Sequence, residues 1–203
     1  MKYTKSLVTL ALIGSALSLS ACGGSNGAES GTAPSAEAVE KQSATPTPTG
    51  PAKSSRGNYV MKAGGKAFAT QTDQLSDKET AKFTVGSIKK GVCTGEYVQA
   101  PTNGNIVFVK VTAQTLPALA ESSFPTFTIS AHDFKFIAKN GTTFNGSLST
   151  VGTYGCLPDA ETFPMAGIGP DQKASGIIVL DVPQPSGTLL VKSDFGAGYE
   201  YTF

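Results

Sequence analysis

The sequence predicts an all-β protein: an immunoglobulin-like antiparallel β-sandwich of about seven or eight strands, preceded by a signal peptide and a disordered tether. Two observations lead to this fold class. In residues 58–203, β-branched and aromatic residues alternate with polar ones at the strand period of two. Glycine, proline and asparagine separate the alternating segments, and long helices are hard to place. Residues 1–57 lack this alternation and are interpreted separately.

Residues 1–21 have the pattern of a secretory signal peptide. Lys2 and Lys5 precede a short apolar run that ends in small residues. The run is about a dozen residues long, whereas a helix that crosses a bilayer needs about 20. Residues 19–22, Leu-Ser-Ala-Cys, resemble the lipobox of bacterial lipoproteins. This resemblance implies cleavage before Cys22, acylation of that residue by chains such as palmitate, and anchoring on the extracytoplasmic face of the cell membrane. A soluble secreted form is the alternative.

Residues 22–57 are predicted to form a flexible, lipid-anchored linker. They are small and polar and contain a single valine, so they bury too little apolar surface to offset the entropy of ordering. A coil of this length spans roughly 30–36 Å. Thr45, Thr47 and Thr49 alternate with proline or glycine. This segment is either a stiff spacer or a site of O-linked glycosylation.

The charge balance argues against nucleic acid as a partner. Without Lys2 and Lys5, the 16 basic residues fall to 14 against 15 acidic ones. Arg56 is the sole arginine and lies in the predicted linker. A domain without arginine and without net positive charge lacks the usual electrostatic surface for binding nucleic acid, and phosphate or carboxylate ligands are also less favoured.

Residues 58–203 contain the strands of one predicted domain. The clearest strand is 105–115, "NIVFVKVTAQT", and residues 80–88 form another with a bulge expected at Gly86. Asn140-Gly141 predicts a type I′ hairpin turn. Further strands are expected in 127–137, 175–183, 187–195 and 198–203. The residues predicted to face the interior are Phe83, Val85, Val107, Val109, Val111, Phe134, Phe136, Ile178, Leu180, Leu189 and Val191.

Cys93 and Cys156 remain once Cys22 is assigned to the lipid. Outside the cytoplasm, two thiols in one domain are normally oxidised to each other. A metal site would need further ligands at characteristic spacing, but the domain has one histidine and no Cys-x-x-Cys. A redox-active pair would tend to be close in sequence. The expectation is therefore a structural disulfide.

The succession of segments resembles an actinobacterial lipoprotein family. The similarity is carried by "FTVGSIKKGVCTGEYVQAPTNGNIVFVKVTAQT", "HDFKFIAKNGTTFNGSLST", "YGCLPD", "GIGPDQKASGIIVLDVPQPSGTLLV" and "YEYTF". The C-terminal domain of that family is an immunoglobulin-like domain of unknown function, distantly similar to small secreted mycobacterial β-sandwich antigens. The resemblance implies this fold, a Cys93–Cys156 pair and surface anchoring. It brings no activity, cofactor or catalytic residue.

No catalytic or metal site is predicted. His132 is the only histidine, and its neighbour Asp133 should point to the opposite face of a strand. There is no Gly-x-Ser-x-Gly motif, so a catalytic triad would rest on composition alone. The acidic residues lack the spacing of a calcium loop. We therefore expect no cofactor and no enzymatic activity.

The expected function is binding or a structural role in the cell envelope, through a membrane anchor and an envelope or extracellular protein partner. Loops on a rigid scaffold usually carry binding. The candidate loops are 96–105, 115–125 and 157–170. Their candidate apolar contacts are Tyr97, Phe124, Phe163 and Met165, for each of which packing inside the domain is the alternative. A carrier of an apolar ligand or lipid is the second hypothesis and requires a cavity. An envelope hydrolase is the third.

Overall fold

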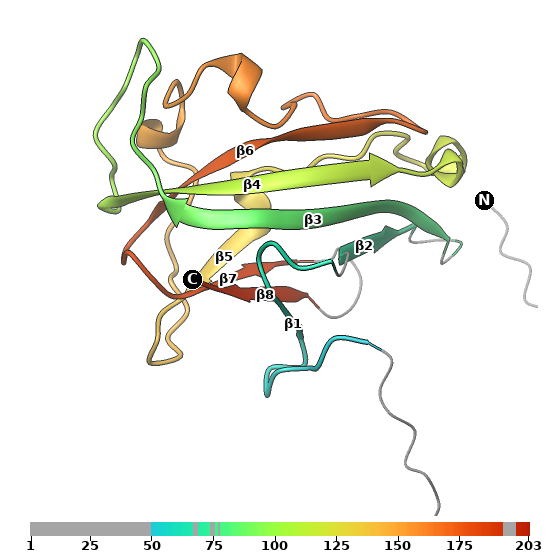
Figure 1. Cartoon of the computed structure of the whole chain (residues 1–203), viewed down its shortest axis with the longest axis horizontal. Helices are drawn as coiled ribbons and strands as arrows, with labels where there is room; N and C mark the ends of the chain where they lie inside the picture. The colour runs from blue at the N-terminus through green and yellow to red at the C-terminus, as the bar shows by residue number, and fades with distance from the viewer. Residues whose placement is uncertain (1–49, 67–68, 74–75, 77, 193–197) are drawn as a thin grey trace, which may run out of the picture. The chain divides into compact units, whose positions relative to one another are not determined.

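The structure is a computed structural model that describes residues 50–203 except 67–68, 74–75, 77 and 193–197. The predicted signal peptide, Cys22 and most of the predicted linker lie outside these residues. The described chain contains eight β-strands in two four-stranded sheets (Figure 1). The strands are β1 (Tyr59–Met61), β2 (Ala69–Thr72), β3 (Glu79–Lys90), β4 (Asn105–Thr115), β5 (Phe134–Ile137), β6 (Lys173–Val182), β7 (Thr188–Val191) and β8 (Tyr199–Thr202).

The strand order is that of an immunoglobulin-like sandwich. One sheet has the order β2-β3-β4-β6 and the other β1-β8-β7-β5. In chain order the polypeptide passes between the sheets four times, after β1, β4, β5 and β6, so that β4 pairs with β6 and β5 pairs with β7. The segments β3-β4-β6 and β5-β7-β8 thus correspond to strands A-B-E and C-F-G of the immunoglobulin fold. The predicted β-sandwich is confirmed, although β1 pairs with β8 in parallel.

The strands with clear alternation lie where the sequence places them. The bounds of β4 coincide with the predicted strand 105–115, and the pairing of β3 with β4 shifts register at Gly86, where a bulge was expected. The turn at Asn140-Gly141 differs from the prediction. Gly141 has a φ of 89°, but Asn140 has none of the positive φ that a type I′ turn requires. Gly141 N–H instead donates to the carbonyl of Ala138, so this is a longer hairpin loop closed by a glycine in the left-handed region.

A continuous apolar core fills the space between the sheets. Every residue predicted to face inward belongs to it. Aromatic side chains join the two sheets, since the Phe83 ring on β3 packs edge-on against Tyr199 on β8. The Tyr199 hydroxyl lies 2.9 Å from the Thr70 backbone nitrogen on β2 and accepts its hydrogen bond. The fold is therefore held by cross-sheet packing as well as by strand pairing.

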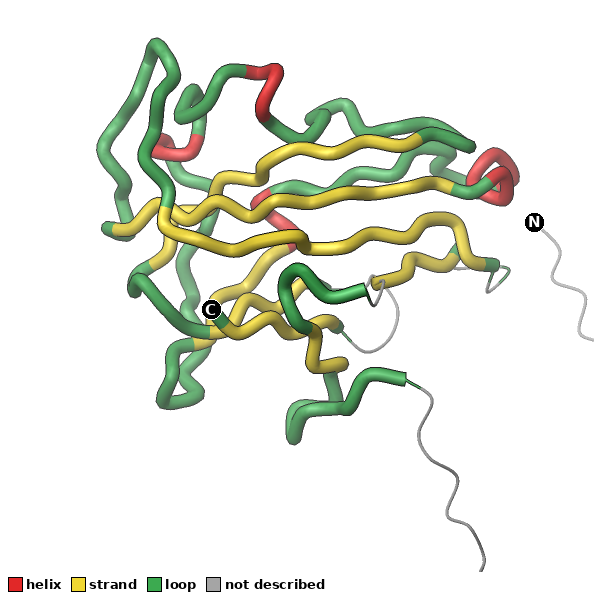
Figure 2. The backbone as a smooth tube through the Cα atoms, in the orientation of Figure 1, coloured by secondary structure: helices red, strands yellow, loops and turns green. Residues whose placement is uncertain are grey.

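Short 3₁₀ turns are the helical elements of the described chain. They are η1 (Pro117–Glu121), η2 (Ala131–Asp133), η3 (Val151–Thr153) and η4 (Asp159–Glu161), drawn as red segments in Figure 2. No helix among the described residues has the length and apolar character needed to span a membrane. Three of the turns, η2, η3 and η4, contact β6 and build the candidate site.

Arg56, which the sequence places in the linker, makes an ion pair with the sandwich. Its guanidinium donates two hydrogen bonds to Glu200 on β8, with Nε–Oε1 at 2.8 Å and Nη2–Oε2 at 2.5 Å. Ser54 and Asn58 donate to the same carboxylate. These hydrogen bonds, led by that of Arg56, outweigh the effect of burial and lower the pKa of Glu200 to about 2. The segment before β1 is thereby fixed to β8.

Candidate functional site

An apolar groove lies along the outer edge of β6. Its volume is about 190 Å³, and its walls come from three segments that are separate in sequence: the approach to η2, the η3 region and the η4 region. Most of the lining area is apolar. The principal lining side chains are Ile129, His132, Tyr154, Leu157, Phe163, Met165, Ile177 and Val179. The turns η2, η3 and η4 each contact β6, so these segments meet along one strand.

The wall nearest η3 is held by the Cys93–Cys156 disulfide, which links the β3–β4 loop to the β5–β6 connection. The Cys156 carbonyl accepts hydrogen bonds from Thr94 and Gly95 at 2.8 and 3.0 Å. Gly95 is required at this point because a side chain there would collide with the Gly155 carbonyl oxygen. The two loops therefore form one layer.

This layer covers one end of the outer face of the sheet. Beneath it, a second apolar cluster is formed by Ile106, Cys156, Leu157 and Val179, with Phe108 and Ile177 packed against it. It explains why the outward positions of β4 begin with the apolar Ile106 and Phe108, whereas Lys110 and Gln114 further along are exposed. Leu157 and Val179 belong both to this cluster and to the groove, so the groove floor is continuous with packed structure.

Asp181 holds the end of β6 beside this layer. Its side chain is fully buried, and Oδ2 accepts from the Asn103 backbone N–H at 2.9 Å and from the Thr150 hydroxyl at 2.7 Å. The Asn103 side-chain amide in turn donates to the carbonyls of Ser147 and Asp181. These bonds connect the β3–β4 loop, the approach to η3 and β6. They fix the position of the η3 wall.

His132 lies in η2 and lines the groove. Its neighbour Asp133 does not orient it, because the Asp133 carboxylate accepts hydrogen bonds from the backbone N–H and hydroxyl of Ser130, at 2.7 and 3.0 Å. This capping box fixes the turn that carries His132. No three His, Cys, Asp or Glu side chains of the described residues are grouped to hold a metal ion. The observed geometry gives His132 a place on the groove wall.

The structure separates the four predicted apolar contacts. Phe163 and Met165 both line the groove, but Phe163 is buried in its floor at 3% exposed, whereas Met165 is 84% exposed. Tyr97 lies outside the groove, next to Gly155 on its rim. Phe124 is also exposed but follows η1, at the opposite end of β4 from the β3–β4 loop (Figure 1). The three predicted loops therefore do not form one surface.

Tyr154 is one of the groove residues that sequence analysis missed. It is 55% exposed, and its hydroxyl lies 3.2 Å from the Ser149 hydroxyl across the η3 turn. Its position two residues before Cys156 was the available signal. The disulfide at Cys156 fixes the chain two residues after Tyr154.

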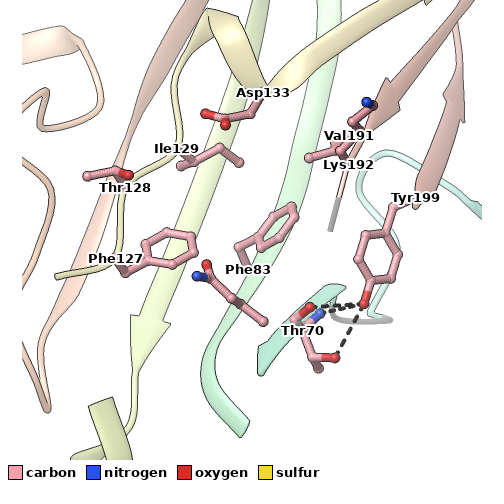
Figure 3. A pocket seen from close by; sticks show the side chains of 10 residues that line it. Thr70, Phe83, Phe127, Thr128, Ile129, Asp133, Val191, Lys192 and Tyr199 are labelled. Carbon is pink, nitrogen blue, oxygen red and sulfur yellow. Dashed lines mark hydrogen bonds between the residues drawn. The ribbon is translucent and has the colours of Figure 1, made fainter. Parts of the chain in front are cut away.

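The space between the sheets is filled. The cavity in Figure 3 lies between β2 and β3 on one side and β7 and β8 on the other, and its volume is about 30 Å³. That is about the share of liquid volume that one water molecule occupies. The rings of Phe83, Phe127 and Tyr199 surround it, and dashed lines mark the hydrogen bonds that join Tyr199 to Thr70. An acyl chain does not fit there.

Comparisons with known proteins give two distant structural similarities. The secreted protein MPT63 of Mycobacterium tuberculosis is 17% identical, with a TM-score of 0.46 over 72% of this chain and 98% of that one. The protein ycdA of Bacillus subtilis is 10% identical, with a TM-score of 0.41 over 68% of this chain and 38% of that one. No protein-family model and no curated protein matches the sequence. The resemblance to actinobacterial lipoproteins is not confirmed and stays a prediction.

Proposed function

We propose that this protein is a lipid-anchored extracytoplasmic lipoprotein whose sandwich is a non-enzymatic binding module. The signal-peptide pattern and the lipobox ending at Cys22 support export and anchoring. The single observation that favours binding is the apolar groove along β6, outside a sandwich whose interior is packed. Backbone hydrogen bonds hold two of the wall segments to β6, from the Phe163 N–H to the Ile177 carbonyl and from the Asp181 N–H to the Leu148 carbonyl. Loops held on a sheet in this way are a rigid arrangement for recognition.

The packed interior argues against a carrier that encloses its ligand between the sheets. Such a protein keeps an apolar pocket of roughly 300–1,000 Å³ for its ligand. The cavity between these sheets has about a tenth of the lower volume, 30 Å³. A carrier would have to hold its ligand outside the sheets, in an open surface hollow such as this groove. Binding of an exposed partner is the function that this geometry favours.

Site-specific photo-crosslinking tests the binding role in intact cells of the source bacterium. A photoreactive residue in place of Met165, which is exposed at the groove, should give one discrete adduct. The same residue in place of Phe124, which is equally accessible but far from the groove, should not. Equal adduct patterns at the two positions, or none at either, would contradict a binding role for the groove.

A further inference from the structure

The backbone of β6 has an open edge inside the groove. Residues of an antiparallel strand point their N–H and C=O groups alternately toward one neighbour and the other. The Ile106 carbonyl of β4 accepts from Gly91, on the β3 side, so its partner Asp181 on β6 points away from β4. By the same alternation, Ile177 and Val179 also point their backbone groups away from β4.

Two other chain segments form backbone hydrogen bonds with this edge of β6, one on each side of Val179. The Asp181 N–H donates to the Leu148 carbonyl at 2.9 Å, and the Ile177 carbonyl accepts from the Phe163 N–H at 3.1 Å. Within the described part of the chain, no hydrogen bond is made to the N–H or C=O of Val179. Val179 lines the groove. Although Val179 is only 8% exposed, its backbone leaves one donor and one acceptor unused between two used positions.

We propose that the groove binds a short, extended, apolar segment of another polypeptide, which pairs one residue with Val179. This inference rests on the proposed binding role and names the chemistry of its ligand. A peptide supplies both a carbonyl for the Val179 N–H and an N–H for the Val179 carbonyl, as in strand addition to a sheet edge. An acyl chain supplies neither and would leave both groups buried without partners.

The length of the segment follows from the two positions that are already used. Ile177 and Asp181 are four residues apart, which is about 13 Å along a strand. A segment that enters between the Leu148 and Phe163 backbones therefore pairs over about three residues before it must turn away from the sheet. The site recognises a short stretch within a longer chain.

The lining indicates which side chains the segment carries. The walls present Ile129, Leu157 and Phe163, with Tyr154 and Met165 exposed at the rim. Asp159 is the acidic lining residue, and it too is exposed. Because the floor is apolar and holds no charged group, a charged side chain would be desolvated there without a partner. The segment therefore carries apolar residues on the side that enters the groove.

Amide exchange measured by NMR tests the open edge first. The sample is the chain from residue 22 onward, carrying Cys22→Ser so that it is made without lipid. In the free protein, the Val179 amide should exchange at least about tenfold faster than the hydrogen-bonded Asp181 amide on the same strand. Equal, slow exchange of both amides would show that the edge is closed and would overturn the inference.

Titration with defined probes tests the ligand class. The peptide acetyl-Gly-Val-Leu-Val-Gly-amide should saturate the groove signals and slow Val179 exchange at least about tenfold. The same peptide N-methylated at its leucine keeps the apolar surface but loses the donor, and should bind at least about tenfold more weakly. Met165→Asp should weaken the peptide, whereas Phe124→Asp, at an equally exposed site outside the groove, should not.

The outcomes separate this inference from the proposed function. If palmitate in place of the peptide saturates the groove, or if N-methylation has no effect, the groove binds by apolar contact alone, and the peptide inference fails while the binding role stands. If neither peptide nor palmitate shifts any groove signal, both fail. Equal effects of Met165→Asp and Phe124→Asp would also overturn the inference.

Discussion

The ion pair between Arg56 and Glu200 should make the stability of the sandwich depend on acid pH. The Glu200 side chain is 4% exposed and its partner Arg56 is 43% exposed, so solvent screens the ion pair in part. Arg56, Asn58 and Ser54 lower its pKa from the ordinary 4.5 to about 2. Since each pKa unit is worth about 1.4 kcal/mol, ionised Glu200 contributes on the order of 3 kcal/mol to the free energy of unfolding at neutral pH.

The sign of the pH dependence follows from the direction of this shift. A carboxylate with a lowered pKa in the folded state binds protons less readily than in the unfolded state. Its contribution is therefore complete above the unfolded pKa, near 4.5, and is lost as the pH falls through the folded pKa, near 2. Glu200→Gln removes the titration while leaving a side chain of similar size. The stability of wild type and variant should therefore differ most at neutral pH and converge near pH 2.

Urea unfolding at a series of pH values measures this difference, on the chain from residue 22 onward carrying Cys22→Ser. At pH 7 the variant should be less stable by about 3 kcal/mol, or roughly 6–12 °C in Tm for a protein of this size. Glu121→Gln is the matched control. Glu121 and Lys78 form an exposed ion pair, which should contribute nothing measurable to the free energy of unfolding. A Glu200→Gln loss of the same size at pH 2 and pH 7, or no loss at pH 7, would refute the reasoning.

Four further outcomes are expected. Cys22→Ala should abolish membrane association and labelling by a fatty-acid probe. If the variant protein stays in carbonate-washed membranes, Cys22 is not the membrane anchor. Cys93→Ser and Cys156→Ser should each destabilise by up to about 4 kcal/mol, with the double variant no worse, and alkylation of both cysteines before reduction would argue against pairing. His132→Ala should leave any hydrolase activity within a few-fold of wild type, so a thousandfold loss of activity in a folded variant would favour an enzyme. Native mass spectrometry of the sandwich should give the bare polypeptide mass, a result that a stoichiometric lipid would contradict.

Strands and their inward faces could be predicted because strand periodicity is local. Val107, Val109 and Val111 alternate with residues of the other face, and the pleat alone sends them to one side, whatever the strand pairs with. The same local rule places the bulge of β3 at Gly86. It could not find β1 or β2. These are short edge strands of three and four residues, and their pairing with β8 and β3 fixes them.

The candidate site could be predicted only in part, because its segments lie far apart in sequence. The loop 157–170 was chosen from composition, but nothing local decides that Phe163 is buried while Met165, two residues later, is exposed. Outside a strand there is no period to follow. The hydrogen bond from the Phe163 N–H to the Ile177 carbonyl holds Phe163 in the floor of the groove. Tyr97 and Phe124 were grouped with them because the sequence does not show at which end of the sandwich a loop lies.

The sequence by itself determined the sandwich class and the alternation of its core, since composition and short-range pattern are sufficient for both. Only the tertiary structure decided that Arg56 pairs with Glu200, 144 residues away, and that Val179 is left open between Asp181 and Ile177. Both depend on which segments of the chain meet after it crosses between the sheets. Hydrogen bonds of that range are set by the packing of whole elements, and no short stretch of sequence encodes them.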